Sequence, residues 1–180
     1  MASSKTGSFT LTETVLLTAT ATPVQGTVDL GAYVDVGDQQ ALAIESVDVI
    51  YQALDANGDP QPGVSAFFAG DAVTQAQLSD LNPGTALQRA DDNSLIASGQ
   101  LYYDSAMVVS IGPDLFPDNY GKLDEARMVV NDQLYCVAEC VTAAALTASL
   151  AVTFRIRARI VKLSTKDWMA IAIQSTAADN

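Results

Sequence analysis

The chain has 180 residues, of which 49% are hydrophobic and 17% charged, and its formal net charge at pH 7 is −12. It contains no histidine, so Ser-His-Asp catalysis, Cys-His catalysis and histidine-ligated zinc sites are excluded. A chain of this length suits one domain with a sizeable core. We expect one β-rich domain over residues 1–180, in which residues 1–7 form a mobile start.

Alternation of apolar and polar residues predicts a series of short strands. It is clear in residues 28–36 and has the period of a strand with one buried face. In residues 41–54 the alternation changes phase near Glu45 and Ser46, which predicts a β-bulge or a bend. In chain order, the predicted strands are residues 8–21, 28–36, 41–54, 64–68, 95–103, 106–111, 127–130, 134–141 and 152–160.

One or two short helices are predicted beside these strands. Asp71 can cap a helix over residues 72–81. Near the end of the chain, Ser164 and Asp167 resemble a capping box, which favours a helix over residues 164–174. Apolar residues alternate in the same segment, so a final strand fits it almost as well.

The most regular alternation in the chain contains three arginines, Arg155, Arg157 and Arg159. They lie in residues 152–160, on the opposite side of the predicted strand from its apolar residues. Alternate residues of a strand are ~6.6 Å apart, so the guanidinium groups form a line of positive charge. This row can face nucleic acid or another polyanion, or carboxylates of neighbouring strands or of a neighbouring subunit. Because the chain has 21 acidic residues, we favour carboxylate partners and a subunit contact.

Other motifs give no catalytic, cofactor-binding or metal-binding residue. Asp55, Asn57 and Asp59 have the initial spacing of an EF-hand loop, but a proline occupies its sixth place, so a plain turn is favoured over a loose calcium site. Cys136 and Cys140 fall on one face of a predicted strand, about 13 Å apart at ~3.3 Å per residue. This separation is too long for a disulfide, which predicts two buried free thiols.

The sequence also bears on localisation. The first residues lack the apolar run of a signal peptide. The longest uncharged apolar stretch near the end, residues 140–154, has 15 residues, whereas a membrane-spanning helix needs about 20. We therefore expect a protein that is made in the cytoplasm, has no transmembrane segment and is not exported by a classical signal.

Three stretches, residues 27–36, 41–51 and 155–174, give the chain a resemblance to the single jelly-roll coat proteins of icosahedral viruses. The resemblance implies an all-β fold, an antiparallel β-sandwich of jelly-roll type with about eight strands. It also implies location in a virion and assembly, with copies of itself and other capsid proteins, into a shell around a genome, sometimes with an internal membrane. Many such proteins have a basic N-terminal arm, whereas Lys5 is the only positive charge at this N-terminus. Direct genome binding by a tail is therefore not expected, and a membrane-lined or prefilled shell fits better.

We therefore predict a structural, self-assembling protein without enzymatic activity or cofactors, most simply a viral capsid subunit. The alternative is a carbohydrate- or receptor-binding β-sandwich module, such as a lectin-like domain on a phage tail, which would use loops 55–63 and 112–121. A hydrolase with paired carboxylates ranks third, because nothing in the spacing of the acidic residues selects a pair.

Overall fold

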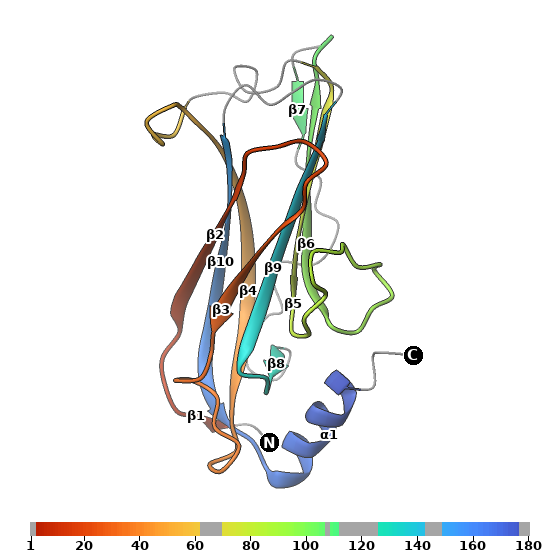
Figure 1. Cartoon of the computed structure of the whole chain (residues 1–180). Helices are drawn as coiled ribbons and strands as arrows, with labels where there is room; N and C mark the ends of the chain where they lie inside the picture. Colours follow the sequence, from red (N-terminus) through yellow and green to blue (C-terminus); the bar gives the residue numbers. More distant parts are fainter. Residues whose placement is uncertain (1–2, 62–69, 107–108, 112–125, 143–148, 177–180) are drawn as a thin grey trace.

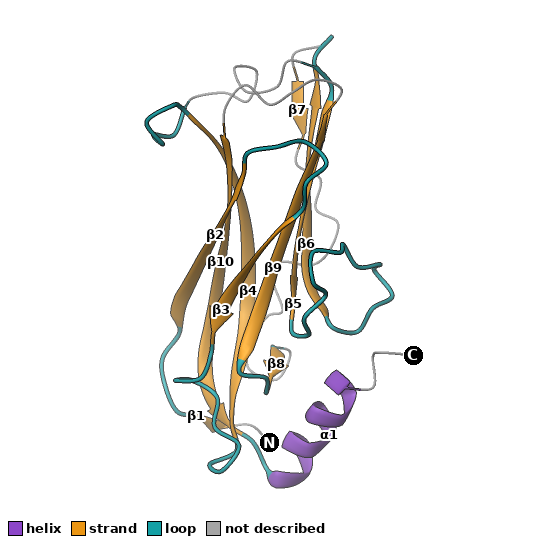
Figure 2. Cartoon of the chain, in the orientation of Figure 1, coloured by secondary structure: helices purple, strands orange, loops and turns teal. Residues whose placement is uncertain are grey.

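The computed structural model describes residues 3–61, 70–106, 109–111, 126–142 and 149–176. These ranges contain ten strands and one helix (Figure 1 and Figure 2). The elements are β1 (Ser3–Ser4), β2 (Phe9–Leu17), β3 (Val24–Asp29), β4 (Gln40–Leu54), β5 (Ala72–Ser79), β6 (Leu95–Asp104), β7 (Val109–Ile111), β8 (Arg127–Val129), β9 (Gln133–Thr142), β10 (Ser149–Lys162) and α1 (Thr165–Thr176).

The strands form two antiparallel sheets that pack face to face (Figure 1). The first sheet has the order β2-β10-β4-β8, and the short β1 also pairs with β10. The second sheet has the order β3-β9-β5-β6-β7. In chain order β2, β4, β8 and β10 go to the first sheet, and β3, β5, β6 and β9 go to the second, which is the interleaved order of a jelly roll. The predicted sandwich of jelly-roll type is confirmed, with β1 and β7 as short additions.

The main core lies between the two sheets, and β10 is central to it. Alternate side chains of this strand are fully buried, whereas Arg155 and Arg157 between them are exposed. The buried residues of β10 are Leu150, Val152, Phe154, Ile156 and Ala158. The facing sheet contributes Leu134, Cys136, Ala138 and Cys140 of β9, among others. The apolar side of the arginine strand is therefore confirmed as core, and both cysteines are buried and free, as expected.

Glu45 is the extra residue of a β-bulge in β4. Arg157 pairs with Ser46 and Ala158 pairs with Ile44, so no residue of β10 is in register with Glu45. The extra residue shifts the alternation by one, and inward apolar side chains before and after the bulge therefore reach the same core. The predicted change of phase near Glu45 and Ser46 is confirmed.

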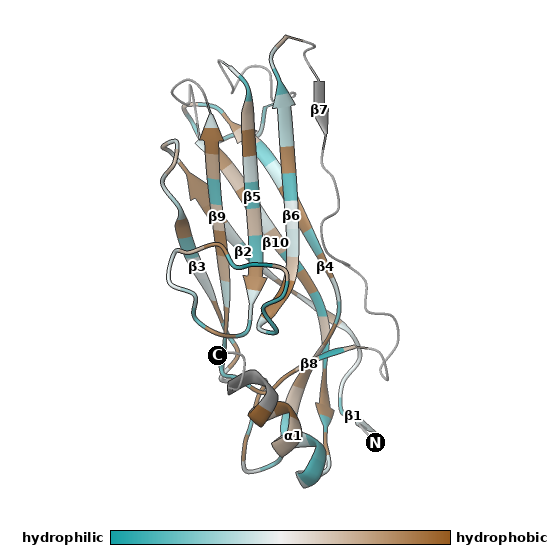
Figure 3. Ribbon diagram, turned by 90° about the vertical axis from the view of Figure 1, so that its right-hand side faces the viewer, coloured by the Kyte–Doolittle hydropathy of each residue, from teal (hydrophilic) through white to brown (hydrophobic). Residues whose placement is uncertain are grey.

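Helix α1 begins after Ser164, which serves as its N-cap and contacts Asp167, the pair that predicted a helix here. The Ser164 hydroxyl accepts the backbone N–H of Asp167 at 3.2 Å and donates to the Asp167 carboxylate at 2.8 Å, which satisfies a free donor of the first turn. The helical alternative for residues 164–174 is thus the right one. The helix lies at the lower end of the molecule, next to β8 (Figure 3). It covers a second apolar cluster formed by Ala41, Ala43, Val130, Val161 and Leu163, against which Trp168, Ile171 and Ala172 pack.

The helix predicted over residues 72–81 is wrong, because this segment forms β5. The strand lies in the middle of the second sheet, hydrogen-bonded to β6 on one side and β9 on the other. Its alternate residues are buried: Ala72, Thr74, Ala76 and Leu78. This burial outweighs the helical propensity of an alanine- and glutamine-containing segment. Asp71, the expected cap, instead accepts hydrogen bonds from the backbone N–H and the hydroxyl of Ser105, at 2.9 and 2.7 Å.

The strand predicted over residues 28–36 is also wrong in its extent, because β3 ends at Asp29. The Asp29 carboxylate accepts the N–H of Gly31 at 2.8 Å, and the N–H of Val34 bonds to the Leu30 carbonyl at 2.9 Å. These local bonds turn the chain, since an aspartate carboxylate that accepts the N–H two residues further on favours a turn over a continued strand.

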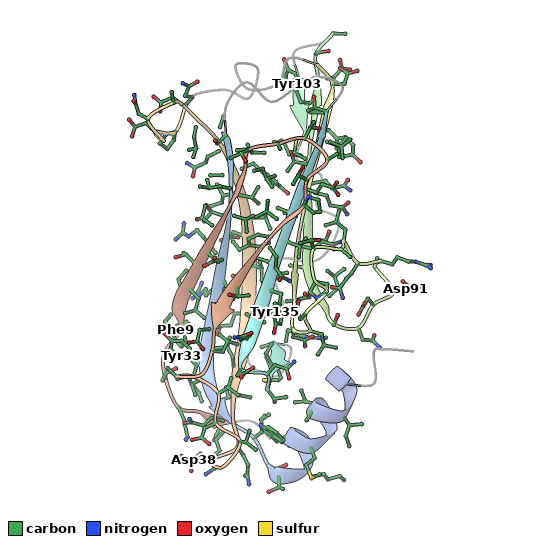
Figure 4. All side chains as sticks on the ribbon, in the orientation of Figure 1. Phe9, Tyr33, Asp38, Asp91, Tyr103 and Tyr135 are labelled. Carbon is green, nitrogen blue, oxygen red and sulfur yellow. The ribbon has the colours of Figure 1, made fainter. Side chains whose placement is uncertain are left out.

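At its other end, β3 begins earlier than expected and runs through Gly26, where the sequence analysis places no strand. A side chain at Gly26 would place its Cβ 2.8 Å from Oε1 of Glu13 and 3.2 Å from Cγ2 of Val15, so the close approach of β2 favours a glycine there. The turn that follows β3 packs back on β2, where the rings of Tyr33 and Phe9 stack with centroids 5.2 Å apart (Figure 4).

The remaining predictions concern two segments outside the described residues and the start of the chain. The predicted strand over residues 64–68 and the loop over residues 112–121 lie outside the described residues. The expected mobile start over residues 1–7 is described from residue 3, and Ser3 and Ser4 pair with the end of β10 as strand β1.

Candidate functional site: the arginine face

The three arginines of β10 lie on the side of the first sheet opposite the main core. Cross-strand register places residues of β2 and β4 beside them. We call this surface the arginine face. Its members are Thr10, Glu45, Ser46, Asp48, Arg155, Arg157 and Arg159.

Glu45 is the charged centre of the arginine face, because both of its carboxylate oxygens are engaged. The Arg159 Nε donates to Oε1 at 2.5 Å, and the Arg157 Nε lies 3.4 Å from Oε2. Ser8 donates its hydroxyl to Oε2 at 2.8 Å and accepts a hydrogen bond from Arg159 at 3.1 Å. The bulge brings the Glu45 carboxylate into this position between two arginines of the adjacent strand.

Opposing influences set the protonation state of Glu45. Burial of the side chain acts to raise its pKa, but the hydrogen bonds from Ser8 and Arg159 and the charges of Arg159 and Arg157 act in the other direction. Together they hold the pKa of Glu45 below its ordinary value of 4.5. Glu45 is therefore ionised at neutral pH and compensates one of the two arginine charges beside it.

Arg155 has different surroundings from the other two arginines. Its register neighbours are Asp48 in β4 and Thr12 in β2, but within the described residues it forms no ion pair. The Arg157 side chain, which shares Glu45 with Arg159, is still 64% exposed. Arg155 and Arg157 line an open depression of about 330 Å³. Its lining residues are Thr10, Ser46, Asp48, Arg155 and Arg157.

The depression is locally positive on a strongly acidic chain. Three arginines face two carboxylates, Glu45 and Asp48, which leaves one positive charge in excess, whereas the whole chain carries −12. Guanidinium groups with unused donors, next to hydroxyls of Thr10 and Ser46, are suited to bind a carboxylate or another small anion.

Arg155, Arg157 and Arg159, which the sequence analysis singled out, therefore lie on one surface. Their contact with another subunit or a polyanion remains a prediction. Sequence reasoning located the bulge but did not connect Glu45 with the arginines. The available signal was that an acidic residue stands at the change of phase, where a bulge re-aims a side chain.

A second charged site, which sequence reasoning missed, connects the two sheets. Arg127 of β8 donates from Nη2 to the Asp80 carboxylate at 3.0 Å and to the backbone carbonyl of Asn93 at 2.6 Å. The Asp80 side chain is only 3% exposed. Burial raises the pKa of Asp80, and the nearby Arg127 charge offsets only part of this effect. The two residues are 47 positions apart, and no local pattern indicates their pairing.

The outer surface of the second sheet carries apolar side chains. Val73 of β5 is in register with Val141 of β9 and with Tyr102 of β6. Val141 is 52% exposed and Tyr102 is 42% exposed. We call these three residues the apolar row. They border a pocket of about 640 Å³, which is also lined by Asp71, Ala72, Tyr103, Asp104 and Thr142.

The described ranges contain neither a metal-binding cluster nor a membrane-spanning helix. There, no cluster of three or more acidic or cysteine side chains is arranged to hold a metal ion. The Asp55 carboxylate accepts the N–H groups of Asn57 and Asp59 at 2.8 and 2.9 Å, which is the plain turn favoured from the sequence. In the part of the chain that the structure describes, no helix has the length and apolar character needed to cross a membrane.

Comparison with known proteins gives structural resemblances only. No family model matches the chain, and no curated protein matches it. VP1 of Trichodysplasia spinulosa-associated polyomavirus, in complex with GM1 oligosaccharide, is similar with a TM-score of 0.48 and 10% identity, over 86% of this chain and 94% of that one. An unassembled VP1 pentamer of Washington University polyomavirus is similar with a TM-score of 0.45 and 8% identity, over 86% and 94%.

A second structure of the first virus's VP1, in complex with sialylated precision glycooligomers, has a TM-score of 0.43 and 8% identity, over 84% of this chain and 94% of that one. VP1 is a jelly-roll capsid protein. At such low identity the likeness concerns fold class, and the jelly-roll assignment itself follows from the strand order of the two sheets. The resemblance to jelly-roll coat proteins that the sequence suggested is confirmed at that level.

Proposed function

We propose that this protein is a structural subunit that assembles with copies of itself, and with other capsid proteins, into the icosahedral shell of a virus. The proposal includes a location in the virion and the absence of enzymatic activity. The observation that carries it is the apolar row on the outer surface of a jelly-roll sandwich.

Outward positions of an antiparallel sheet that faces water are normally polar. At the end of the second sheet, Val73, Val141 and Tyr102 instead form one continuous row across three strands. A contiguous exposed apolar surface beside a pocket is typical of an interaction site. Tyrosine is enriched at such sites because its ring supplies contact area and its hydroxyl tolerates water.

The arginine face supports the same proposal from the opposite sheet. Its excess positive charge stands on a chain whose formal net charge is −12. Such a surface suits contact with the acidic surface of another copy, since charge complementarity orients subunits and suppresses wrong contacts. Nucleic acid is a weaker candidate partner, because a phosphate-binding surface is usually broadly basic.

The proposal is tested by measuring the mass of the purified protein in solution. Sedimentation velocity from micromolar to near-millimolar concentration, with electron microscopy of the same samples, should show oligomers that grow into rings or shells. A protein that remains a monomer over this whole range, at both low and high salt, would contradict the proposal.

Two variants locate the contact. Tyr102→Ser and Val141→Thr should each reduce assembly at a given concentration, because each removes apolar surface that assembly would bury. Leu16→Thr is the matched control, since Leu16 is 49% exposed but lies outside the apolar row. Equal loss of assembly in all three variants would argue against the apolar row as a specific contact.

A carbohydrate-binding module is the second candidate, because the pocket beside the apolar row combines an exposed tyrosine ring with two carboxylates. Sugars stack on aromatic rings, and carboxylates accept hydrogen bonds from their hydroxyls. In this pocket, those groups would be Tyr102, Asp71 and Asp104. A glycan array on the monomeric fraction tests this candidate, and binding that Tyr102→Ser abolishes would favour it over assembly.

A further inference from the structure

We propose that the depression on the arginine face receives the acidic turn of a second copy of this chain, with the Asp38 carboxylate placed against Arg155 and Arg157. We define the acidic turn as Asp35, Val36, Gly37 and Asp38, between β3 and β4. The inference rests on the proposed self-assembly and specifies which two surfaces of the chain meet.

The depression keeps more positive charge than the carboxylates beside it, Asp48 and Glu45, compensate. Arg155 has no ion pair among the described residues, and the Arg157 side chain, whose Nε lies 3.4 Å from the Glu45 carboxylate, remains 64% exposed. Both guanidinium groups therefore keep unused donors, which are matched by a carboxylate better than by any neutral group.

The acidic turn is held rigid in a shape that presents a carboxylate. The Asp35 carboxylate accepts the N–H of Gly37 at 2.7 Å and the N–H of Asp38 at 3.3 Å, and backbone hydrogen bonds join Asp35 and Gln40 in both directions. Asp35 is thus used within the turn, whereas Asp38 is exposed. Figure 4 shows Asp38 at the lower end of the molecule, at the tip of its loop.

Other exposed acidic groups fit less well. Asp91 is already paired with Arg89 at 3.3 Å. The turn at Asp55 and Asp59 has similar hydrogen bonds but no large exposed apolar side chain. In the acidic turn, by contrast, Val36 is 65% exposed, and a contact with another copy would cover this side chain.

The two surfaces of one molecule cannot meet each other. Asp48, the register neighbour of Arg155, lies eight residues along β4 from its first residue, Gln40, which is roughly 26 Å at ~3.3 Å per residue, and the acidic turn precedes Gln40. The contact therefore joins two different patches on two copies. Such head-to-tail contacts close into rings when the rotation between copies allows it, and rings are natural building units of a shell.

A charge exchange tests the pairing. Asp38→Arg and Arg155→Glu should each lower the apparent association constant about tenfold or more, since each places like charges in contact. The double variant restores opposite charges and should recover most of the association. Sedimentation velocity over a concentration series measures all of these proteins.

The controls make the same changes of charge at other exposed sites. Asp59→Arg matches Asp38→Arg, and Arg89→Glu matches Arg155→Glu. Both controls should associate as the wild type does. Arg155→Glu adds a negative charge opposite Asp48 and can lower stability by itself, so thermal unfolding is recorded for each variant. The neutral variants Asp38→Asn and Arg155→Gln, alone and combined, give the same comparison without charge reversal.

The possible results separate the two proposals. A wild-type chain that never associates overturns the proposed function. If the wild type assembles and the Asp38→Arg and Arg155→Glu variants assemble equally well, only the pairing is overturned. The pairing also fails if both single variants lose association and the double variant does not regain it. It fails as well if Arg155→Glu leaves assembly intact but removes a steeply salt-dependent affinity for DNA, which would assign the depression to a polyanion.

Discussion

Replacement of Glu45 by glutamine should destabilise the protein measurably, although the site is on the surface of a sheet. Glutamine keeps the shape and one acceptor oxygen but removes the charge that Arg159 and Arg157 share. A hydrogen bond to a charged group contributes about 1.5–3 kcal/mol, and the longer contact to the mostly exposed Arg157 adds at most about 0.5 kcal/mol. Since the remaining oxygen of glutamine retains part of this stabilisation, we expect the free energy of unfolding to fall by about 2 kcal/mol.

The assay is thermal unfolding followed by circular dichroism. For a chain of this size, 1 kcal/mol shifts Tm by roughly 2–4 °C, so Glu45→Gln should lower Tm by about 4–8 °C at pH 7. Glu139→Gln is the matched control, because Glu139 has no ion pair within the described residues. Its Tm should stay close to that of the wild type.

The pH dependence of the same variant gives a second check. The pKa of Glu45 is lower in the folded chain than its ordinary value of 4.5, so its contribution to stability is fully present above that value and is lost as pH falls through the lowered pKa. The Tm difference between wild type and Glu45→Gln should therefore be constant from pH 6 upwards and shrink in acid. A Tm difference below about 1 °C at pH 7, or one that does not change with pH, would refute the ion-pair account.

Three further predictions probe other parts of the fold. Asp80→Ala should lower the free energy of unfolding by about 3 kcal/mol in a urea titration, because it leaves Arg127 without its partner. Asp80→Asn should cost less than half of that, because burial already disfavours the charge. Ser164→Ala should lower the free energy of unfolding by about 1 kcal/mol and shift the fluorescence of the single tryptophan to longer wavelength. An unchanged spectrum would show that α1 stays docked without its cap. Cys136 and Cys140 should not react with a thiol reagent in the folded chain, since both are buried and burial raises the pKa of each; rapid native reaction would show that the sheets open.

The sequence predicted best those strands in which polarity differs strongly between the two faces. In β10 each arginine or threonine alternates with an apolar residue, and the structure follows that pattern from Val152 to Ala158. The pattern failed for β5, where small or polar residues such as Ala76, Gln77 and Ser79 are all buried. The second half of β5, from Ala76 to Ser79, is buried on both faces and so has no exposed polar side to reveal its period.

The candidate site could be predicted only in part for a related reason. Strand alternation is local, so the three arginines could be placed on one surface from the sequence. Their partners depend on register between strands that are distant in the chain, and Glu45 and Arg159 are 114 residues apart. The same limit applies to Asp80 and Arg127, which meet only because β8 and the end of β5 come together in the folded sandwich.

The bulge at Glu45 couples the arginine face to the core, and this coupling decides which arginine is the better probe of assembly. Without the extra residue, the alternation that buries Ile44 would turn Val47 outward, yet Val47 is 1% exposed. Variants of Arg157 or Arg159 alter the bulge carboxylate and so affect stability together with any contact between copies. Arg155 does not touch Glu45, and a change in association caused by Arg155→Gln, without a change in Tm, therefore reports on the surface alone.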